Sequence, residues 1–96
     1  MANTSPGYGI TIRVEGRAEF QPVAEITTII TREGAMITAL DVADSQLDSV
    51  VIDVTCDAID AAHAERITSA LSASPILKVR KVSDRTFLLH LGGKLE

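Results

Sequence analysis

Two alternating apolar segments, each followed by apolar residues at helical spacing, constrain the fold of this chain more than any other feature. Ile10, Ile12 and Val14 alternate with polar side chains, which predicts a half-buried strand over residues 8–15. A second strand of this kind is predicted over residues 50–56, and its apolar side consists of Val50, Ile52, Val54 and Cys56. The chain therefore contains two halves that begin in the same way.

A helix is predicted after each of these strands. Pro22 fits the first turn of the earlier helix, because its missing N–H is not needed there, and Gly34 fits a left-handed position just past the end. Asp57 or Asp60 can cap the later helix. The apolar residues at helical spacing are Val23, Ile26, Ile29 and Ile30 in the first helix and Ala64, Ile67 and Leu71 in the second.

Residues 36–43 and 76–82 are predicted to form two further strands, so the order strand, helix, strand occurs twice. The arrangement that buries these elements is an α+β fold. It is a ferredoxin-like βαββαβ domain, with both helices on one face of a four-stranded antiparallel sheet. Right-handed crossovers predict the strand order 4-1-3-2. In this interpretation strands one and three are central and parallel to each other, and strands two and four are the edges.

The composition argues against several classes of function. The 96 residues suffice for one domain, and with two Phe, one Tyr and no Trp its core must consist of Ile, Val, Leu and Ala. A net charge of −4 and few aromatic side chains argue against nucleic-acid binding. The sequence has no signal-peptide pattern and no apolar run near the roughly 20 residues of a membrane span. A cytoplasmic protein that does not contact membranes is therefore expected.

No group of residues has the spacing of a catalytic or metal-binding site, so this chain is not expected to be an enzyme or to hold a metal or cofactor. Cys56 is predicted to be a buried, inert thiol. His63 is interpreted as part of a solvated helix face. His90 is expected to pack or to face solvent within the C-terminal segment.

The polar sides of the two central strands carry Arg13 and Asp53. This predicts a charge pair on the sheet face away from the helices, with Arg80 of the fourth strand as a candidate third member. Such a face is too polar to be covered by another helical layer. It leaves room for a partner that brings charges of its own.

The domain is predicted to span residues 8–82, after a flexible N-terminus at residues 1–7. Residues 83–96 lie beyond the four predicted strands and include the apolar run Phe87–Leu91. Because such a run needs something to pack against, residues 83–96 are interpreted as a junction to a further domain.

The segment Arg32-Glu33-Gly34-Ala35-Met36-Ile37-Thr38-Ala39 resembles the helix end, glycine and apolar strand of ACT domains. The resemblance covers residues 8–82. It implies a small regulatory module that is attached to a metabolic enzyme and often binds an amino acid.

The C-terminal segment, Val82 to Glu96 with its Gly92-Gly93-Lys94, resembles the junction in bacterial NAD-dependent malic enzymes that carry an N-terminal ACT domain. The opening Ala2-Asn-Thr-Ser-Pro-Gly-Tyr8 is similar to actinobacterial examples. The resemblance implies a parent enzyme that oxidatively decarboxylates malate to pyruvate. It also implies that a catalytic domain outside this chain uses NAD(P) and Mg or Mn.

A candidate effector site lies in the predicted loop 16–22 together with residues 34–38, two segments that are expected to abut. Gly16 would let a ligand approach backbone N–H groups at the start of the first helix, and Arg17 would hold a carboxylate. The alternative is an ordinary turn and helix cap, and the Pro-Gly dipeptide typical of amino-acid-binding ACT domains is absent here. The candidate ligand-binding residues are Gly16, Arg17, Ala18, Phe20, Gly34, Ala35, Met36 and Thr38.

Two functions follow as hypotheses. In the first, the module senses a small metabolite such as an amino acid at an interface between protomers. In the second, it binds no small molecule and serves as a dimerisation or assembly module, because the end of strand two, Asp41 to Asp44, has no protective lysine. Both hypotheses predict a homo-oligomer, most simply a dimer.

Overall fold

The computed structural model describes residues 8–84, which form four strands, two α-helices and one short 3₁₀ turn. In chain order they are β1 (Tyr8–Arg17), the 3₁₀ turn η1 (Ala18–Phe20), α1 (Pro22–Arg32), β2 (Met36–Ser45), β3 (Ser49–Ala58), α2 (Ala61–Ala73) and β4 (Leu77–Asp84). The expectations for His90, Phe87–Leu91 and the N-terminal segment lie outside the described residues.

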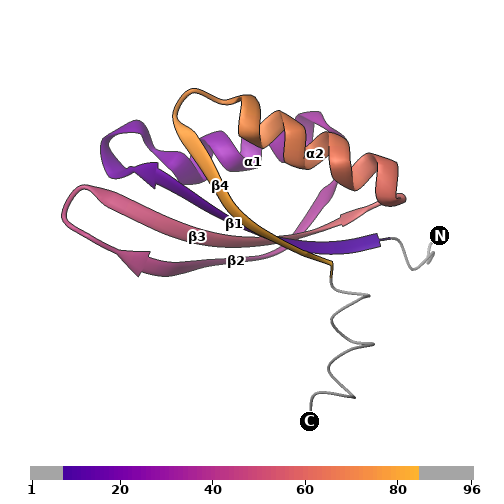
Figure 1. Ribbon diagram of the computed structural model, residues 1–96, viewed down its shortest axis with the longest axis horizontal. Coiled ribbons are helices and arrows are strands. Elements are labelled where there is room, and N and C mark those ends of the chain that lie inside the picture. The colour runs from indigo at the N-terminus through magenta and orange to yellow at the C-terminus, as the bar shows by residue number, and fades with distance from the viewer. Residues whose placement is uncertain (1–7, 85–96) are drawn as a thin grey trace, which may run out of the picture.

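The four strands form one sheet in the order β2-β3-β1-β4, and each neighbouring pair is antiparallel (Figure 1). This confirms the predicted α+β class and strand order, and it is consistent with a ferredoxin-like fold. The predicted parallel alignment of β1 and β3 is wrong, because they pair antiparallel. The β2–β3 hairpin reverses the chain between the two halves. The parallel pairs are therefore β1 with β2 and β3 with β4, which are not neighbours in the sheet.

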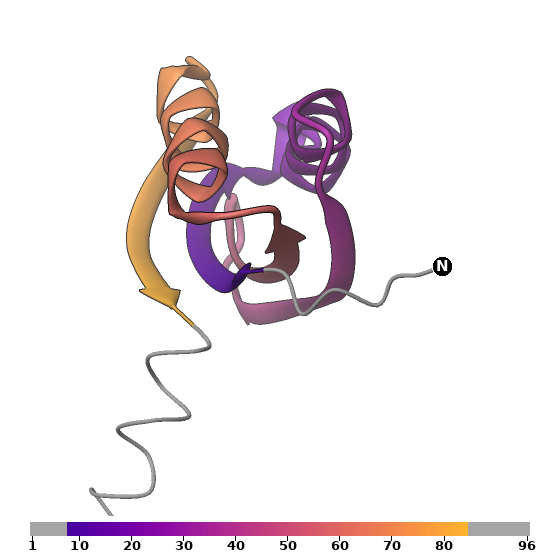
Figure 2. The same ribbon diagram turned by 90° about the vertical axis from the view of Figure 1, so that its right-hand side faces the viewer.

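Both helices cover the same face of the sheet, and the other face has no layer over it within residues 8–84 (Figure 2). The core between the helices and the sheet is almost entirely aliphatic, as predicted. The buried apolar residues are Ile10, Ile12, Val14, Ile26, Ile29, Ile30, Ile52, Val54, Cys56, Ala58, Ala64, Ile67, Leu71 and Leu77. Val23 belongs to the predicted stripe of α1 but is 38% exposed.

The predicted helix ends are confirmed at three residues. Pro22 occupies the first turn of α1, and Gly34 follows the helix with φ +85°, where its N–H donates to the Thr31 carbonyl. At α2 the Asp60 carboxylate accepts a hydrogen bond from the His63 N–H at 2.8 Å. Asp57, the alternative cap, lies within β3.

β1 is longer than predicted and includes Gly16 and Arg17. Gly16 pairs with Val50 on one side and with Leu77 on the other, so it belongs to the sheet and not to a loop. None of the helices within residues 8–84 is long and apolar enough to span a bilayer.

Candidate functional site

A cavity of about 320 Å³ lies where β1 ends and β4 begins, and we call it the Arg17 cavity. It brings together Gly16, Arg17 and Phe20 of the predicted site. Sequence reasoning missed the contribution of β4 and the turn before it, because only the fold places them beside the end of β1. The residues around the cavity are Glu15, Gly16, Arg17, Phe20, Ser49, Pro75, Ile76, Leu77, Lys78 and Arg80.

The Arg17 cavity combines cationic and apolar side chains. Arg80 is bound to Glu15 at 2.6 Å, and Arg17 lies 3.5 Å from Glu19 in an exposed pair. Within residues 8–84, Lys78 has no carboxylate at ion-pair distance, so its charge is available to an incoming anion. Phe20 is 46% exposed and supplies an apolar surface beside these charges. The cavity is therefore suited to an anionic group with an apolar body.

The second half of the predicted site lies at the other end of the sheet. Arg17 pairs with Ser49 at the start of β3, whereas Met36 pairs with Asp57 near its end. Eight residues of extended chain separate these positions, a distance of about 27 Å. Within one chain the segments 16–22 and 34–38 therefore do not abut, and that expectation is wrong. The predicted topology was expected to bring the two segments together, but α1 carries the chain from one end of the sheet to the other.

Five residues of the predicted site do not line the cavity, and their surroundings are different. They are Ala18, Gly34, Ala35, Met36 and Thr38. The Ala18 N–H donates to the Asp48 carbonyl at 3.0 Å, which ties η1 to the β2–β3 hairpin. The Thr38 hydroxyl donates to the Thr55 carbonyl at 3.3 Å. Ala35 packs against the core, its N–H donates to the Ile30 carbonyl, and Met36 is 68% exposed on the edge strand. A ligand in the Arg17 cavity would therefore not reach Ala35, Met36 or Thr38 of the same chain.

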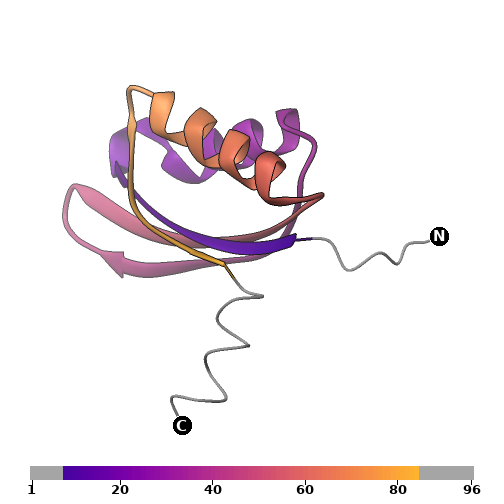
Figure 3. The same ribbon diagram turned by 45° about the vertical axis from the view of Figure 1, so that its right-hand side comes forward.

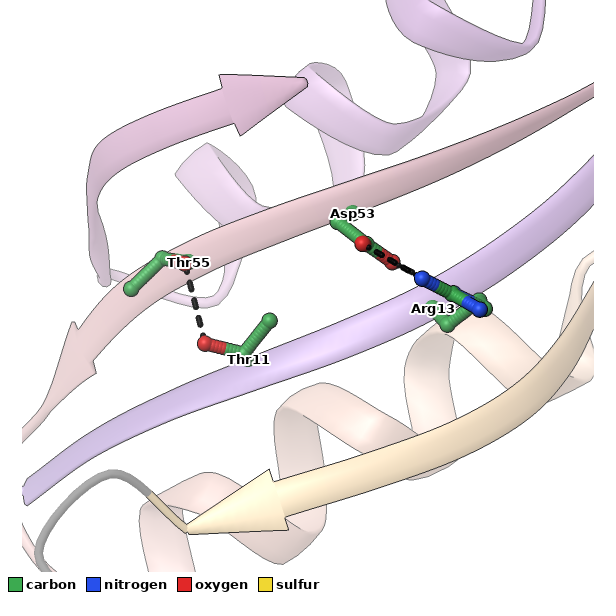
Figure 4. Close-up of polar contacts among 4 residues, drawn as sticks. All are labelled: Thr11, Arg13, Asp53 and Thr55. Atoms are coloured by element: carbon green, nitrogen blue, oxygen red, sulfur yellow. Dashed lines mark hydrogen bonds and ion pairs between the residues drawn. The ribbon is translucent and has the colours of Figure 1, made fainter. Parts of the chain in front are cut away.

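The sheet face away from the helices, which we call the open face, carries the predicted charge pair (Figure 4). Arg13 donates from Nε and Nη2 to the two carboxylate oxygens of Asp53, at 2.8 and 2.9 Å. This hydrogen-bonded pair lowers the pKa of the Asp53 carboxyl. Beside it, the hydroxyls of Thr11 and Thr55 are 2.9 Å apart. The Arg13–Asp53 prediction is confirmed.

Arg80 does not join the Arg13–Asp53 pair but binds Glu15 instead. The pairing of β1 with β4 shifts between Arg13 and Val14, so Lys81 lies opposite Arg13 and Val79 opposite Val14. Arg80 falls in this irregularity. Such a bulge changes where side chains point, and the sequence does not reveal it.

His63 lies in the interior and not on a solvated face, which makes its interpretation from the sequence wrong. It is 2% exposed. Its Nδ1 accepts from the Ile59 N–H at 2.9 Å, and its Nε2 donates to the Glu33 carbonyl at 2.6 Å. The neutral ring with a proton on Nε2 satisfies both bonds. His63 therefore links the end of α1 to the start of α2.

The prediction that Cys56 is buried is confirmed, because its side chain has no exposed surface. Burial raises the pKa of the thiol to about 11 from its ordinary value of 9.0, with the nearby Asp57 carboxylate as a smaller cause. The thiolate is the reactive form of cysteine. At neutral pH this residue is therefore part of the core and not a nucleophile.

The raised pKa of Cys56 predicts that the folded state loses stability in alkali. The unfolded chain releases the thiol proton near pH 9 and the folded chain near 11, so stability is complete below pH 9 and falls as the pH rises to 11. The expected loss is about 1 kcal/mol by pH 10. Urea denaturation of the wild type and of Cys56→Ala between pH 8 and 10.5 measures it. Parallel curves for the two proteins would refute the prediction.

Among residues 8–84, no three His, Cys, Asp or Glu side chains are grouped so that they could hold a metal ion. The Arg17 cavity has a single carboxylate, Glu15, and that group is bound to Arg80. The other charged side chains around the cavity, Arg17, Lys78 and Arg80, are cationic.

The strands and helices form a small α+β domain that is consistent with a ferredoxin-like fold. No protein-family model matches the chain. Over 87 residues, or 91% of its length, the chain is 37% identical to an NAD-dependent malic enzyme of Geobacillus stearothermophilus. The chain spans only 18% of the length of that enzyme, so it corresponds to a fragment of it.

Among solved structures, the chain is similar to the C-terminal domain of the MgtC protein from Mycobacterium tuberculosis. The TM-score is 0.59, and the match covers 84% of this chain and 88% of that domain. The sequences are 19% identical, so this similarity shows the fold alone.

Proposed function

We propose that this chain is an N-terminal regulatory domain of the ACT type in a malic enzyme, and that it senses a small metabolite such as an amino acid. The observation that carries the proposal is the 37% identity to a malic enzyme over 91% of this chain. A stretch that covers 18% of the enzyme is too short for catalysis but long enough for a regulatory domain. The described βαββαβ order supports the ACT assignment.

In this proposal the chemistry belongs to a catalytic domain in the full protein. That domain oxidatively decarboxylates malate to pyruvate in the cytoplasm, and it holds NAD(P) and a Mg or Mn ion. The residues of this chain take no part in those steps. Their role is to bind an effector and to change the equilibrium between two states of the enzyme, which requires a difference in effector affinity between those states.

The Arg17 cavity is the proposed effector site. Its volume of about 320 Å³ lies within the range of small-ligand sites. Arg17 and Lys78 would bind the carboxylate of the effector, and Phe20 would pack against its apolar part. This site lies within one chain and does not include the segment from Gly34 to Thr38, which is at the other end of the sheet.

Calorimetric titration of the chain tests this function, with the twenty amino acids, malate and pyruvate as ligands. We expect heat of binding for at least one carboxylate, and a loss of affinity of roughly tenfold or more in Arg17→Ala and Lys78→Ala. Arg66→Ala, on the exposed side of α2, is the matched control and should bind normally. No heat and no thermal shift with any ligand at millimolar concentration would contradict the proposal.

The second candidate is an assembly module that binds no small molecule. One observation favours it: β2 is a sheet edge on which nearly every side chain is exposed, including Met36 and Val42. Residues 36–45 contain no Lys or Arg, the residues that commonly protect such edges from pairing. Light scattering tests this candidate, and a strictly monomeric chain at high concentration would contradict it.

A further inference from the structure

Charges on the open face are sorted from one edge of the sheet to the other. One row of paired residues crosses all four strands in the order Lys81, Arg13, Asp53, Asp41. The next charged row runs Lys78, Glu15, Val51, Asp44. The β4 edge is therefore cationic and the β2 edge is anionic.

This sorting is unfavourable within a single chain. In the first row Lys81 lies opposite Arg13 and Asp41 lies opposite Asp53, so like charges stand side by side at both ends of that row, whereas in the second row Lys78 lies opposite Glu15. The Arg13–Asp53 pair neutralises only the centre of its row. Within residues 8–84, Lys78, Lys81 and Asp41 form no ion pair, and Asp44 accepts a hydrogen bond from the neutral Gln46 amide. A partner molecule that brings opposite charges to the β4 and β2 edges would reduce this repulsion.

We propose that the open face binds the open face of a second copy of this chain. The two copies are related by a two-fold axis that runs parallel to the strands, between β1 and β3. A rotation about this axis keeps the position along the strands and exchanges the two edges. It places Lys81 opposite Asp41 of the second copy and Lys78 opposite Asp44 of the second copy.

Other ways of pairing two copies lack this match. A two-fold axis perpendicular to the strands would stack β4 on β4 and β2 on β2, and it would bring like charges together. Edge-to-edge pairing of two β2 strands would place Asp41 and Asp44 near the same residues of the other copy. Face-to-face stacking of sheets with nearly aligned strands is a common packing, and within residues 8–84 nothing covers this face of the sheet (Figure 3).

The size of the open face predicts a dimer of modest affinity. Four strands at a spacing of ~4.8 Å and up to ten residues at ~3.4 Å give a flat area of roughly 600 Å². Stable complexes bury about 800 Å² on each partner. A hollow of about 490 Å³ beside Arg13, Asp44 and Arg80 offers room for long side chains of the second copy. Because the attraction is largely between exposed charges, salt should weaken it.

Complementary charge reversal in the whole 96-residue chain tests the proposal. One variant carries Lys78→Glu and Lys81→Glu, which makes the β4 edge anionic. The other carries Asp41→Lys and Asp44→Lys, which makes the β2 edge cationic. In either variant alone the two edges repel, whereas a mixed pair restores both sets of opposite charges. The control Arg32→Glu/Arg66→Glu changes net charge as the first variant does, but on the helices.

Sedimentation equilibrium and native mass spectrometry at low salt give the readout. We expect a wild-type dimer, at least tenfold weaker association for each variant alone, and a heterodimer in the equimolar mixture, with the helix control unchanged. Circular dichroism confirms that each variant is folded. A wild-type monomer at about 1 mM, or a mixture that stays monomeric, overturns the proposal. So does a dimer that survives reversal of the β4 edge, because it would use another surface. The inference does not rest on effector binding, which calorimetry measures separately.

Discussion

Replacing His63 by alanine is expected to lower the free energy of unfolding by about 3 kcal/mol. The ring makes one hydrogen bond to the Ile59 N–H and one to the Glu33 carbonyl, and its side chain is buried. Alanine leaves both backbone groups without this partner, and each unsatisfied buried group costs about 1–3 kcal/mol. The loss is large beside the ~5–15 kcal/mol that stabilises a typical domain.

Two amide variants separate the two hydrogen bonds of His63. Asparagine places a carbonyl oxygen near the position of Nδ1, so it can still accept from the Ile59 N–H. Glutamine places an amide nitrogen near Nε2, so it can still donate to the Glu33 carbonyl. Each should recover about half of the stability that alanine loses. The Asp60 cap bonds the backbone N–H of residue 63, and it is available in all three variants.

Urea denaturation monitored by circular dichroism measures these differences. Asp60→Ala serves as a reference, because it removes the cap alone and should cost about 1 kcal/mol. If His63→Ala cost no more than Asp60→Ala, the side chain of His63 would not hold the two helices together.

The sequence predicted the elements of the fold because local patterns determine them. Alternation of Ile10, Ile12 and Val14 identifies β1 without reference to the rest of the chain, and Pro22 and Gly34 mark the ends of α1. The error in strand direction was one of topology. It would have been avoided by following the chain reversal through the β2–β3 hairpin, which makes neighbouring strands antiparallel throughout.

His63 was wrongly assigned to a solvated helix face because the interpretation relied on its polar side chain and not on its position in the helix. It stands four residues before Ile67 and eight before Leu71, on the same side of α2 as both of these buried residues. A histidine at that spacing belongs to the buried stripe and must find hydrogen-bond partners there. The spacing was visible in the sequence. The identity of the partners was not, because Glu33 is thirty residues away.

The sequence predicted only the part of the candidate site that is contiguous in the chain. Residues 16–20 are neighbours in sequence, and three of the four predicted there line the Arg17 cavity. Lys78 reaches the same cavity through the pairing of β4 with β1, and Ile76 reaches it from the turn before β4, and no local pattern encodes this pairing. The segment 34–38 was placed beside them because the predicted topology was expected to bring the two segments together. Within one chain the length of α1 separates the segment 34–38 from the Arg17 cavity.

Replacing Gly16 by alanine is expected to cost about 2 kcal/mol of stability, less than the loss of the His63 ring but more than the loss of a helix cap. A Cβ at this position would lie 2.7 Å from Cβ of Pro22 and 3.2 Å from the carbonyl oxygen of Ile76. Neither neighbour can move easily, because one belongs to a proline ring at the start of α1 and the other to the backbone. The added methyl group must therefore push α1 away from the sheet.

A double-mutant cycle with Pro22→Gly tests this cause directly. Pro22→Gly alone should destabilise by about 1 kcal/mol, because glycine adds freedom to the unfolded chain. In the Gly16→Ala background the same change removes the 2.7 Å contact, so the two effects should be less than additive by about 1–2 kcal/mol. Urea denaturation of the four proteins gives the coupling energy.

The same cycle decides between two reasons for a glycine at position 16. The sequence suggested that Gly16 lets a ligand approach the backbone, whereas the structure shows Pro22 already in that space. If packing is the reason, Gly16→Ala loses stability and the coupling with Pro22 is present. If the four free energies are additive and Gly16→Ala is as stable as the wild type, close packing is not the reason. A loss of effector binding without a loss of stability would then assign Gly16 to the Arg17 cavity as a ligand contact.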